Sequence, residues 1–454
     1  MTDRIRNNAI TEGVIWKQLL KYFFPIVLGT LFQQMYNTVD AIVVGQYVGK
    51  EALAAVGGTT GTLINLLVGF FVGLSSGATV VISRFFGAKD EKGVSDSVHT
   101  AFALSIAGGL IVTVLGLVFI PMGLGLLNTP PELIADAKLY IRILFAGLLF
   151  ALIYNMGSGI LRAIGDSKRP LYILIVCCVV NIVLDVVTVK YLGMGIAGAA
   201  YATVAAQAVS AALVVIILLR SRECYRLIPR RIRFHADILR SIIRIGLPTG
   251  LQSMMFTVSN LYIQAAVNRF GTDIIAGWTG VGKVDSLVWM VLDAFGISVT
   301  TFAGQNIGAG KMDRVKKAML QCGAMAVVFC ALFSLSMILF GRNIMGLFSQ
   351  EESVVDSAML LMRCLYWFYV VYVPIQVISG VLRGAGDTMK PMLMIALGIC
   401  VFRTIWIFIC LRLDTGIETM IYSYGASWIL TAAMFVIYYC RGKWRERITL
   451  LQRS

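Results

Sequence analysis

The chain has 454 residues, of which 58% are hydrophobic and only 14% are charged, and its formal net charge is +15. Soluble globular proteins usually carry roughly 25% charged residues, so this composition excludes an ordinary soluble domain. The apolar runs are continuous rather than alternating, which disfavours a membrane barrel. We therefore predict an all-α polytopic membrane protein.

Twelve apolar segments, taken in chain order, are each long enough to cross a hydrocarbon core of about 30 Å. We expect these spans at residues 15–45, 52–83, 97–126, 132–158, 170–190, 195–219, 237–268, 275–303, 316–340, 354–380, 391–411 and 418–440. In the second span, glycines at positions 69, 73 and 77 are spaced by four, which predicts close helix packing on that face. An even number of spans places both termini on the same side of the membrane.

The basic residues predict the orientation. They are concentrated in the N-terminal tail, in alternate loops and in the C-terminal tail, and the densest stretch is "RSRECYRLIPRRIRF" between the sixth and seventh spans. By the positive-inside rule these segments face the cytoplasm, so we expect a protein of the cytoplasmic (inner) membrane with both termini in the cytoplasm. The positive charge then contacts anionic lipid, and no nucleic acid is needed to explain it.

One polar turn is written twice. "GILRAIGDSKRP" at residues 159–170 returns as "GVLRGAGDTMKP" at residues 380–391. Pro25 in the first span corresponds in the same way to Pro248 in the seventh. Six spans per repeat is an even number, so both halves enter the membrane in the same direction, as parallel repeats related by an axis along the membrane normal. We predict two six-helix bundles, 1–219 and 237–454, joined by a basic linker at 220–236.

The repeated turn itself has a structural explanation. Its glycines tolerate the positive φ that ends a helix. Asp166 and Asp387 can cap the following helix, whose first turn contains Pro170 or Pro391. We expect the arginines of the turn to lie at the lipid surface and the turn to have no direct role in substrate binding.

The first half contains two acids inside its spans. Asp40 and Asp185 each lie about five residues from the outer end of their span, roughly 7–8 Å deep. Buried carboxylates in a membrane usually face a cavity or a partner. Five neutral polar residues share the depth or the helix face of these acids: Tyr36, Asn37, Tyr140, Asn181 and Thr203. We predict one polar pocket in the outer part of the first bundle.

Three functions are open to such a pocket. Two neighbouring buried carboxyl groups disfavour double ionisation, so one of them can carry a proton. Alternatively, the oxygen atoms could coordinate a hard cation such as Na⁺. The structural alternative is an ion pair with Lys138, Arg142 or Lys190, which approach a similar depth.

The second half has its own acids on the eighth span. Asp285, Trp289 and Asp293 are spaced by four and form one helical stripe. An acid beside an aromatic ring suits a lipophilic cation through charge pairing and cation–π contact. The predicted substrate cavity also includes Met290 and Gln252; the alternative is pairing of these acids with Arg363 or Arg403.

Several of these features together resemble a known family. The doubled "LR…GD…P" turn, "QNIGAG" after the eighth span and "MYNTVDAIVVGQYVG" in the first are similar to the multidrug and toxic compound extrusion (MATE) transporters. The resemblance covers nearly the whole chain. It implies a secondary-active antiporter that exchanges inward H⁺, or Na⁺, for outward amphipathic cationic compounds.

The resemblance also bears on the site. In the proton-coupled, DinF-like branch, an acid on the first span and an Asn-x-x-x-Asp on the fifth form the coupling site, joined by a Tyr and a Thr. These positions are occupied here by Asp40, Asn181, Asp185, Tyr140 and Thr203. The family bends the first span at a proline, which implies a bend at Pro25, with Pro248 as its repeat partner. The sodium-coupled branch keeps acids on spans seven and ten, whereas here span seven has Gln252 and Gln264 and span ten has no Asp or Glu after Asp356.

Two other classes of function are less compatible with the sequence. A lipid-linked precursor flippase favours an arginine-rich cavity, whereas the membrane charges of the first bundle are mainly acidic. A membrane-embedded enzyme needs clustered His, Glu or Cys at one depth, and the nine cysteines show no CxxC pair and sit mostly inside spans as core thiols. We therefore expect no enzyme activity and no cofactor. The expected partners are small amphipathic substrates, H⁺ or Na⁺ and membrane lipids, and we expect a monomer.

Overall fold

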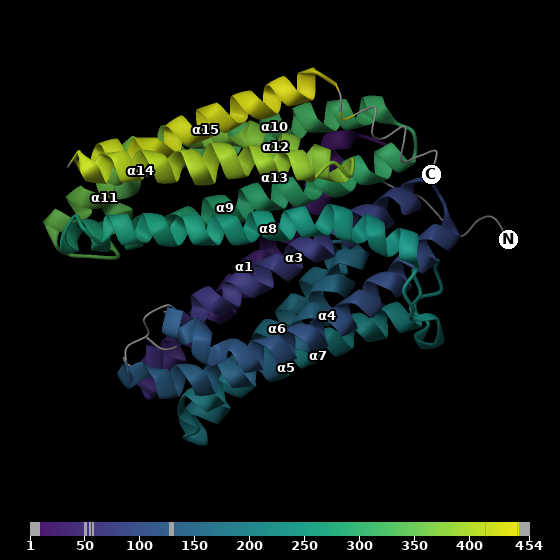
Figure 1. The fold of residues 1–454 in the computed structure, drawn as a ribbon, viewed down its shortest axis with the longest axis horizontal. Helices are drawn as coiled ribbons and strands as arrows, with labels where there is room; N and C mark the ends of the chain where they lie inside the picture. Colours follow the sequence, from purple (N-terminus) through teal and green to yellow (C-terminus); the bar gives the residue numbers. More distant parts are fainter. Residues whose placement is uncertain are drawn as a thin grey trace. The chain divides into compact units, whose positions relative to one another are not determined.

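A computed structural model of the chain describes residues 10–49, 52–53, 56, 59–126, 131–413, 415–442 and 444, and the secondary structure of these residues is helical (Figure 1). The first half contains α1 (Ile15–Tyr47), α3 (Thr59–Gly87), α4 (Glu91–Leu126), α5 (Pro131–Ala163), α6 (Lys168–Asp185) with the π-helical turn η1 (Val186–Tyr191), and α7 (Gly195–Arg220). A short 3₁₀ turn, η2 (Pro229–Arg231), lies in the linker. The second half contains α8 (Ala236–Val267), α9 (Thr272–Gly308), α10 (Met312–Gly346), α11 (Glu352–Leu365), η3 (Tyr366–Phe368), α12 (Tyr369–Gly384), α13 (Met389–Ile395), η4 (Ala396–Val401), α14 (Phe402–Arg412) and α15 (Ile417–Cys440).

These elements correspond to the twelve predicted spans, and the prediction of an all-α membrane fold is confirmed. The tenth span is made of α11, η3 and α12, and the eleventh of α13, η4 and α14. Ten of the described helical segments are long and apolar enough to cross a membrane. The remaining two, α1 and α8, begin the two halves, and each contains a proline within the helix, Pro25 and Pro248.

The chain divides into two compact units at places that the sequence repeat does not mark. The first unit includes residues Lys21–Gly250, and the second includes Ile10–Leu20 and the chain from Leu251 onward. The predicted boundaries at 219 and 237 follow the repeat, whereas the units divide inside α1 and α8. The physical reason is that the first turns of α1 pack with the second unit, while the first half of α8 packs with the first unit.

Two glycines of α3 explain why the first half of α8 packs with the first unit. A Cβ atom at Gly77 of α3 would lie 2.4 Å from the Ile242 carbonyl oxygen, and one at Gly73 would lie 2.4 Å from the Gly250 nitrogen. The backbones of α3 and α8 therefore approach more closely than any side chain allows. The predicted packing role is confirmed for these two glycines.

Polar contacts hold the segment before α1 to the second unit. The Arg314 guanidinium donates to the carbonyl oxygens of Ile10 and Gly13 at 3.3 and 3.0 Å. The Asn306 amide also donates to the Ile10 carbonyl, and the Lys311 ammonium donates to that of Thr11. The start of α1 is thus fixed by side chains at the junction of α9 and α10.

The linker before α8 is held to the first unit in a comparable way. The Ile228 backbone N–H donates to His99 Nε2 at 3.0 Å, and His235 contacts the Thr100 hydroxyl at 3.0 Å. His99 lies on α4 and is almost completely buried. The segments that directly precede α1 and α8 are therefore both hydrogen-bonded to folded helices.

The repeated turn is built largely as predicted. Gly165 and Gly386 have φ values of +92° and +78°. Asp166 caps α6 by accepting hydrogen bonds from two backbone N–H groups at 3.1 Å each. Asp387 is buried and accepts a hydrogen bond from the Tyr438 hydroxyl. Arg383 departs from the expected place at the lipid surface, because its guanidinium lies near Asp293.

Candidate functional site

The two acids of the first half lie together in the interior of the first unit. Asp40 of α1 is 7% exposed and Asp185 of α6 is 0% exposed. Their carboxyl groups are close enough for one to donate a hydrogen bond to the other when it is protonated. When both are ionised, neither can donate, and the Asp185 oxygens then have no hydrogen-bond partner.

Helices α5 and α7 complete this group, which we call the acid pocket: Asp40, Asp185, Tyr36, Tyr140, Asn181 and Thr203. The Thr203 hydroxyl donates to Asp40 Oδ2 at 3.2 Å and also reaches the Ala199 carbonyl oxygen one turn earlier on α7. The Tyr140 ring is 5% exposed, and its hydroxyl lies beside both acids. The structure therefore brings these side chains together from four helices.

The helix that carries Asp185 changes geometry at this residue. Asp185 ends α6, and the next six residues form the π-helical turn η1. Asn181 lies one turn earlier on the same face, is 0% exposed, and neither its amide oxygen nor its nitrogen has a hydrogen-bond partner. Such π-helical turns widen a helix locally and often occur at functional sites.

The acid pair has no ion-pair partner among the residues that the structure describes. Lys190, one of the expected alternatives, instead lies over the rings of Tyr47 and Tyr191 at 5.3 and 5.6 Å. A carboxylate buried without a cation is costly. Binding a proton or a metal cation relieves that cost.

Two predicted features of the first half need separate comment. Asn37 is exposed, and its nearest hydrogen bond is a long one of 3.5 Å to Gln34, so it lies outside the enclosed arc of α1 that carries Asp40. Pro25 is inside a continuous α1, as Pro248 is inside α8; bending at these residues stays a prediction.

The acids of the second half occupy two different environments. Asp285 lies beside the hydroxyls of Tyr366 and Tyr369. Asp293, two turns along α9, accepts a hydrogen bond from the Gln376 amide at 3.0 Å. Neither acid forms an ion pair with Arg363 or Arg403 within the described part of the chain.

An aromatic cluster surrounds Trp289 of the predicted substrate cavity. The Trp289 ring contacts Tyr372, Tyr369 and Trp428, with centroid separations of 4.8, 6.0 and 6.1 Å. No polar contact places Gln252 or Met290 in this cluster; both are partly buried on α8 and α9. The stripe is thus centred on a packed aromatic cluster, with an acid about one turn to each side of Trp289 along α9.

Arg403 is a charged residue of this region that the sequence indicated only as a pairing partner. It is 3% exposed, its guanidinium lies 3.9 Å from the centroid of the Tyr424 ring, and it donates to the Ser427 hydroxyl at 2.9 Å. Two features of the sequence could have indicated this contact: a single arginine inside the apolar eleventh span, and the stretch "YGASW" in the twelfth. Its stabilisation comes from an aromatic face and a hydroxyl rather than from a carboxylate.

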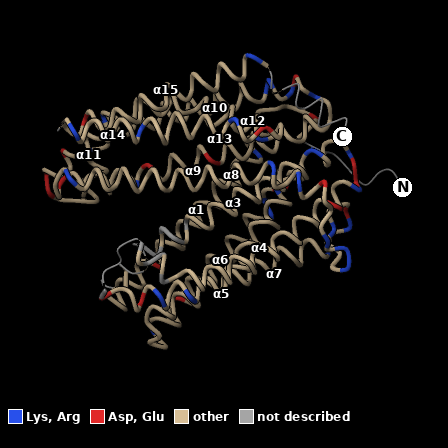
Figure 2. The backbone as a smooth tube through the Cα atoms, in the orientation of Figure 1, with Lys and Arg blue, Asp and Glu red and all other residues tan. Residues whose placement is uncertain are grey.

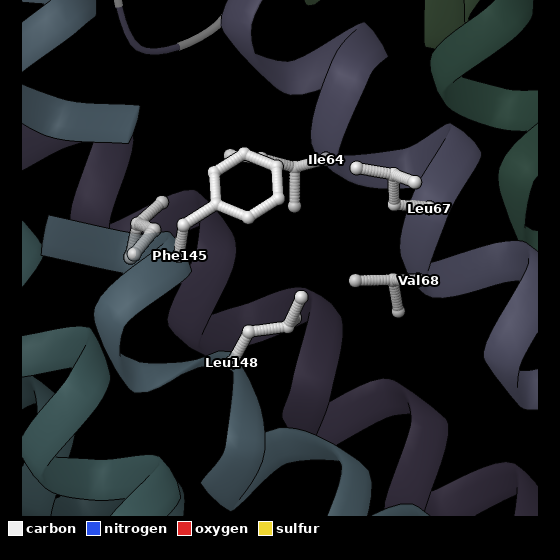
Figure 3. A pocket seen from close by; sticks show the side chains of 6 residues that line it. Ile64, Leu67, Val68, Phe145 and Leu148 are labelled. Atoms are coloured by element: carbon white, nitrogen blue, oxygen red, sulfur yellow. The ribbon is translucent and has the colours of Figure 1, made fainter. Parts of the chain in front are cut away.

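A small apolar pocket lies between α3 and α5 (Figure 3). Its lining is Ile64, Leu67, Val68, Leu144, Phe145 and Leu148. These side chains provide no hydrogen-bonding group, so the pocket cannot hold an ion and is separate from the acid pocket.

The charges of each unit are distributed as a membrane protein requires. Lys and Arg are mostly near helix ends, and the middles of the helices carry few charges (Figure 2). The acids Asp40, Asp185, Asp285 and Asp293 are exceptions to this distribution. Exceptions of this kind usually mark functional positions in membrane proteins.

Comparison with known proteins gives consistent results. A sequence model of the family described as MatE matches residues 25–187 and again residues 248–409, so the two matches begin at the paired prolines. The chain is 30% identical over 437 residues to the "Probable multidrug resistance protein YpnP" of Bacillus subtilis, covering 96% of this chain and 97% of that protein. It is 25% identical to the "Probable multidrug resistance protein NorM" of Thermotoga maritima, covering 96% and 94%.

The fold is also found among solved structures. One is described as the outward-facing conformation of a multidrug resistance MATE family transporter, with a TM-score of 0.89 and 23% identity over 99% of both chains. Another, from Pyrococcus furiosus, has the same TM-score and 24% identity, and its description reports a reversed polarity of the binding pocket.

Proposed function

Because the chain belongs to the MatE family of membrane transporters and is not an enzyme, we propose that it exports amphipathic, cationic organic compounds in exchange for inward protons. The acid pocket is the proposed coupling site. The protein would act in the cytoplasmic membrane with both termini and the basic linker in the cytoplasm, which the concentration of Lys and Arg there supports.

One observation carries the proposal: two buried carboxyl groups from α1 and α6 are neighbours, and no basic residue in the described part of the chain pairs with them. Two like charges at such a place cannot both persist, so the pair binds a proton and shares it. Loss of that proton restores the electrostatic repulsion between Asp40 on α1 and Asp185 on α6. It also changes the hydrogen bond that Asp40 accepts from the Thr203 hydroxyl. A helix arrangement that differs in stability between the two protonation states is what ion coupling requires.

The driving force is adequate for export. One inward proton crossing 100 mV supplies about 2.3 kcal/mol, but a monovalent cation moved outward costs the same amount, so a one-for-one exchange is driven by the proton concentration gradient, at about 1.4 kcal/mol per pH unit. A second proton per cation would add the electrical contribution.

The substrate class follows from the relatives and from the second unit. Relatives are described as multidrug resistance or multidrug export proteins, and Asp285 beside Trp289 offers a carboxylate and an aromatic face to an organic cation. A more distant relative from Shewanella oneidensis, 24% identical, is described as an FAD transporter. An anionic cargo is therefore the alternative that a transport test has to separate.

Sodium is the second candidate ion. Asp40, Asp185, Asn181 and Thr203 present oxygen atoms, several of them without a hydrogen-bond partner, and hard cations prefer oxygen ligands.

The test is transport of ethidium into and out of proteoliposomes under an imposed ΔpH or an imposed Na⁺ gradient. The variants are Asp40→Asn and Asp185→Asn, and the matched control is Asp313→Asn, an acid whose side chain is 90% exposed on α10. We expect ΔpH-driven transport that both pocket variants abolish and the control retains. Transport driven by Na⁺ alone would replace the proton by sodium. Full activity of both pocket variants would refute the site, and transport of flavin nucleotides without ethidium would refute the substrate class.

A further inference from the structure

Two stripes of polar side chains extend from the acid pocket toward the opposite end of the first unit. On α6, Cys177, Asn181 and Asp185 are spaced by four, and on α5, Tyr154 and Ser158 continue in the same spacing to Arg162. Residues four apart lie above one another on one helix face. The α5 stripe ends at the α5–α6 turn, where the Arg162 carbonyl oxygen accepts a hydrogen bond from the Tyr22 hydroxyl at 2.9 Å.

The stripes are connected to each other and to Asp40. The hydroxyl of Tyr36, one turn from Asp40 on α1, has Cys177, Asp40 and Tyr154 among its electrostatic neighbours. The hydroxyl of Tyr154 in turn has Ser158, Arg162 and Cys177 as neighbours. Polar groups therefore follow one another from the acid pair to the end of the unit that carries the α5–α6 turn.

Several members of this series are buried without a hydrogen-bond partner. Among the described residues, no hydrogen bond of normal geometry reaches the Asn181 amide or the hydroxyls of Tyr154 and Ser158, although these two hydroxyls lie near each other; Ser158 and Asn181 are 0% exposed. Two other buried serines of the unit, Ser105 and Ser210, each donate to a carbonyl oxygen of their own helix, whereas Ser97 on α4 is also buried and unpaired within the described part of the chain. A buried hydroxyl without a partner loses the hydrogen bonds that it makes with water in the unfolded chain, so Ser158 and Tyr154 weaken the fold unless ordered water pairs with them.

Ordered water is the usual partner of such groups. A hydroxyl that accepts one hydrogen bond and donates another can form a new O–H bond on one side while its original O–H bond breaks on the other, and rotation of the hydroxyl then restores the starting orientation. Water molecules can extend such a chain across gaps between side chains. The guanidinium of Arg162 near the end of the stripe disfavours a resting cation, so the path suits proton transfer along O–H bonds rather than passage of Na⁺.

We propose that Tyr36, Tyr154 and Ser158, together with ordered water, relay the proton between the acid pair and the end of the first unit that carries the α5–α6 turn. The relay rests on the proposed proton coupling and adds a route to it. In the proposed orientation this end faces the cytoplasm, so the proton leaves through the first unit itself. Tyr154 and Ser158 then transfer the proton along this path and do not bind the organic substrate.

The test measures the amplitude and the rate of proton release separately. Protein is reconstituted into proteoliposomes, ethidium is added on the side of the α5–α6 turn, and pyranine on that side records released protons in a stopped-flow instrument. The variants are Tyr154→Phe and Ser158→Ala. The matched controls are Tyr172→Phe, which removes a hydroxyl from a tyrosine that is 60% exposed, and Ser105→Ala, which removes a buried hydroxyl outside the stripes.

We expect both relay variants to release the same number of protons as the wild type, at a rate lower by at least about tenfold, because a transfer group is missing from the path. The double variant should be little slower than the slower single variant, since the groups act in series. Ethidium affinity should be unchanged, and both controls should keep the wild-type rate.

The outcomes distinguish the relay from the coupling site. Proton release that persists in Asp40→Asn and Asp185→Asn, or is absent in the wild type, would overturn the proposed function and the relay with it. If the acid variants lose release but Tyr154→Phe and Ser158→Ala keep the wild-type rate, the relay alone is refuted. A slower rate in the controls as well, or a reduced amplitude in the relay variants, would also refute it, because packing or the acid pair itself would then be affected.

Discussion

The close contact between α3 and the first half of α8 gives a prediction with a definite sign and size. Gly77→Ala adds one methyl group, and an ideal Cβ there would lie 2.4 Å from the Ile242 carbonyl oxygen and 2.7 Å from the Gly246 nitrogen. These neighbours are backbone atoms of a helix, so they cannot rotate away as a side chain would. One of the two helices has to move.

Overpacking of this kind costs about 1–3 kcal/mol, and the upper end applies here because the clash is with backbone. For a unit of this size, each kcal/mol shifts the unfolding midpoint by about 2–4 °C, so we expect Tm to fall by roughly 6–12 °C. The matched control is Gly323→Ala on α10, where a Cβ would meet nothing within 4 Å. Alanine there should stabilise the helix by about 0.5–1 kcal/mol.

The assay is thermal unfolding of purified protein in detergent, followed by tryptophan fluorescence. A second readout is the rate of ethidium transport, which should fall in Gly77→Ala at temperatures close to its lowered midpoint. Equal midpoints for Gly77→Ala and Gly323→Ala would refute the conclusion that α3 and α8 meet backbone to backbone.

Two further predictions concern segments outside the spans. Arg314→Gln removes most of the hydrogen bonds that hold residues 10–13 to the rest of the second unit, so backbone hydrogen exchange in residues 10–20 should accelerate about tenfold. The control variant Arg240→Gln, at an exposed arginine, should leave this exchange rate unchanged. Equal exchange rates in the two variants would contradict the proposed contacts of Arg314. Burial, with smaller contributions from Glu91 and Glu223, raises the pKa of the Cys224 thiol to about 11. A raised pKa leaves less thiolate at pH 8. In a Cys440→Ser background, iodoacetamide should therefore alkylate Cys224 about a hundredfold more slowly than an ordinary thiol, and the rate should rise up to about pH 11. Rapid labelling of Cys224 at pH 8 would contradict its buried environment.

Much of the fold could be predicted because its signals are local. The length of an apolar run, the four-residue spacing of a helix face and the turn chemistry of Gly165 and Asp166 depend on neighbours in the chain. Asp40 and Asp185 could be placed at one depth for the same reason, since depth is a count of residues from the end of a span. The double match of the family to the two halves agrees with the repeat that the turn first indicated.

Other features depend on which helices meet, so they could not be predicted from neighbours in the chain. Asn37 precedes Asp40 by three residues, yet it is exposed while Asp40 is buried, because packing of α1 with α6 and α7 determines which narrow arc of the helix is enclosed. Arg383 lies near Asp293 rather than at the expected lipid surface, and the Arg403 guanidinium lies over the ring of Tyr424.

The division of the chain shows the same limit. Two repeats of six helices could be predicted from the sequence, since a repeat is visible in the order of residues. The sequence did not determine that α1 and α8 each divide between compact units, because that depends on backbone contacts such as Gly77 with Ile242 and on the docking of Ile10 by Arg314. Likewise Tyr154 and Ser158 are ordinary residues in the sequence and become distinctive only in the fold, where surrounding helices bury both hydroxyls and, among the described residues, leave them without a hydrogen bond of normal geometry.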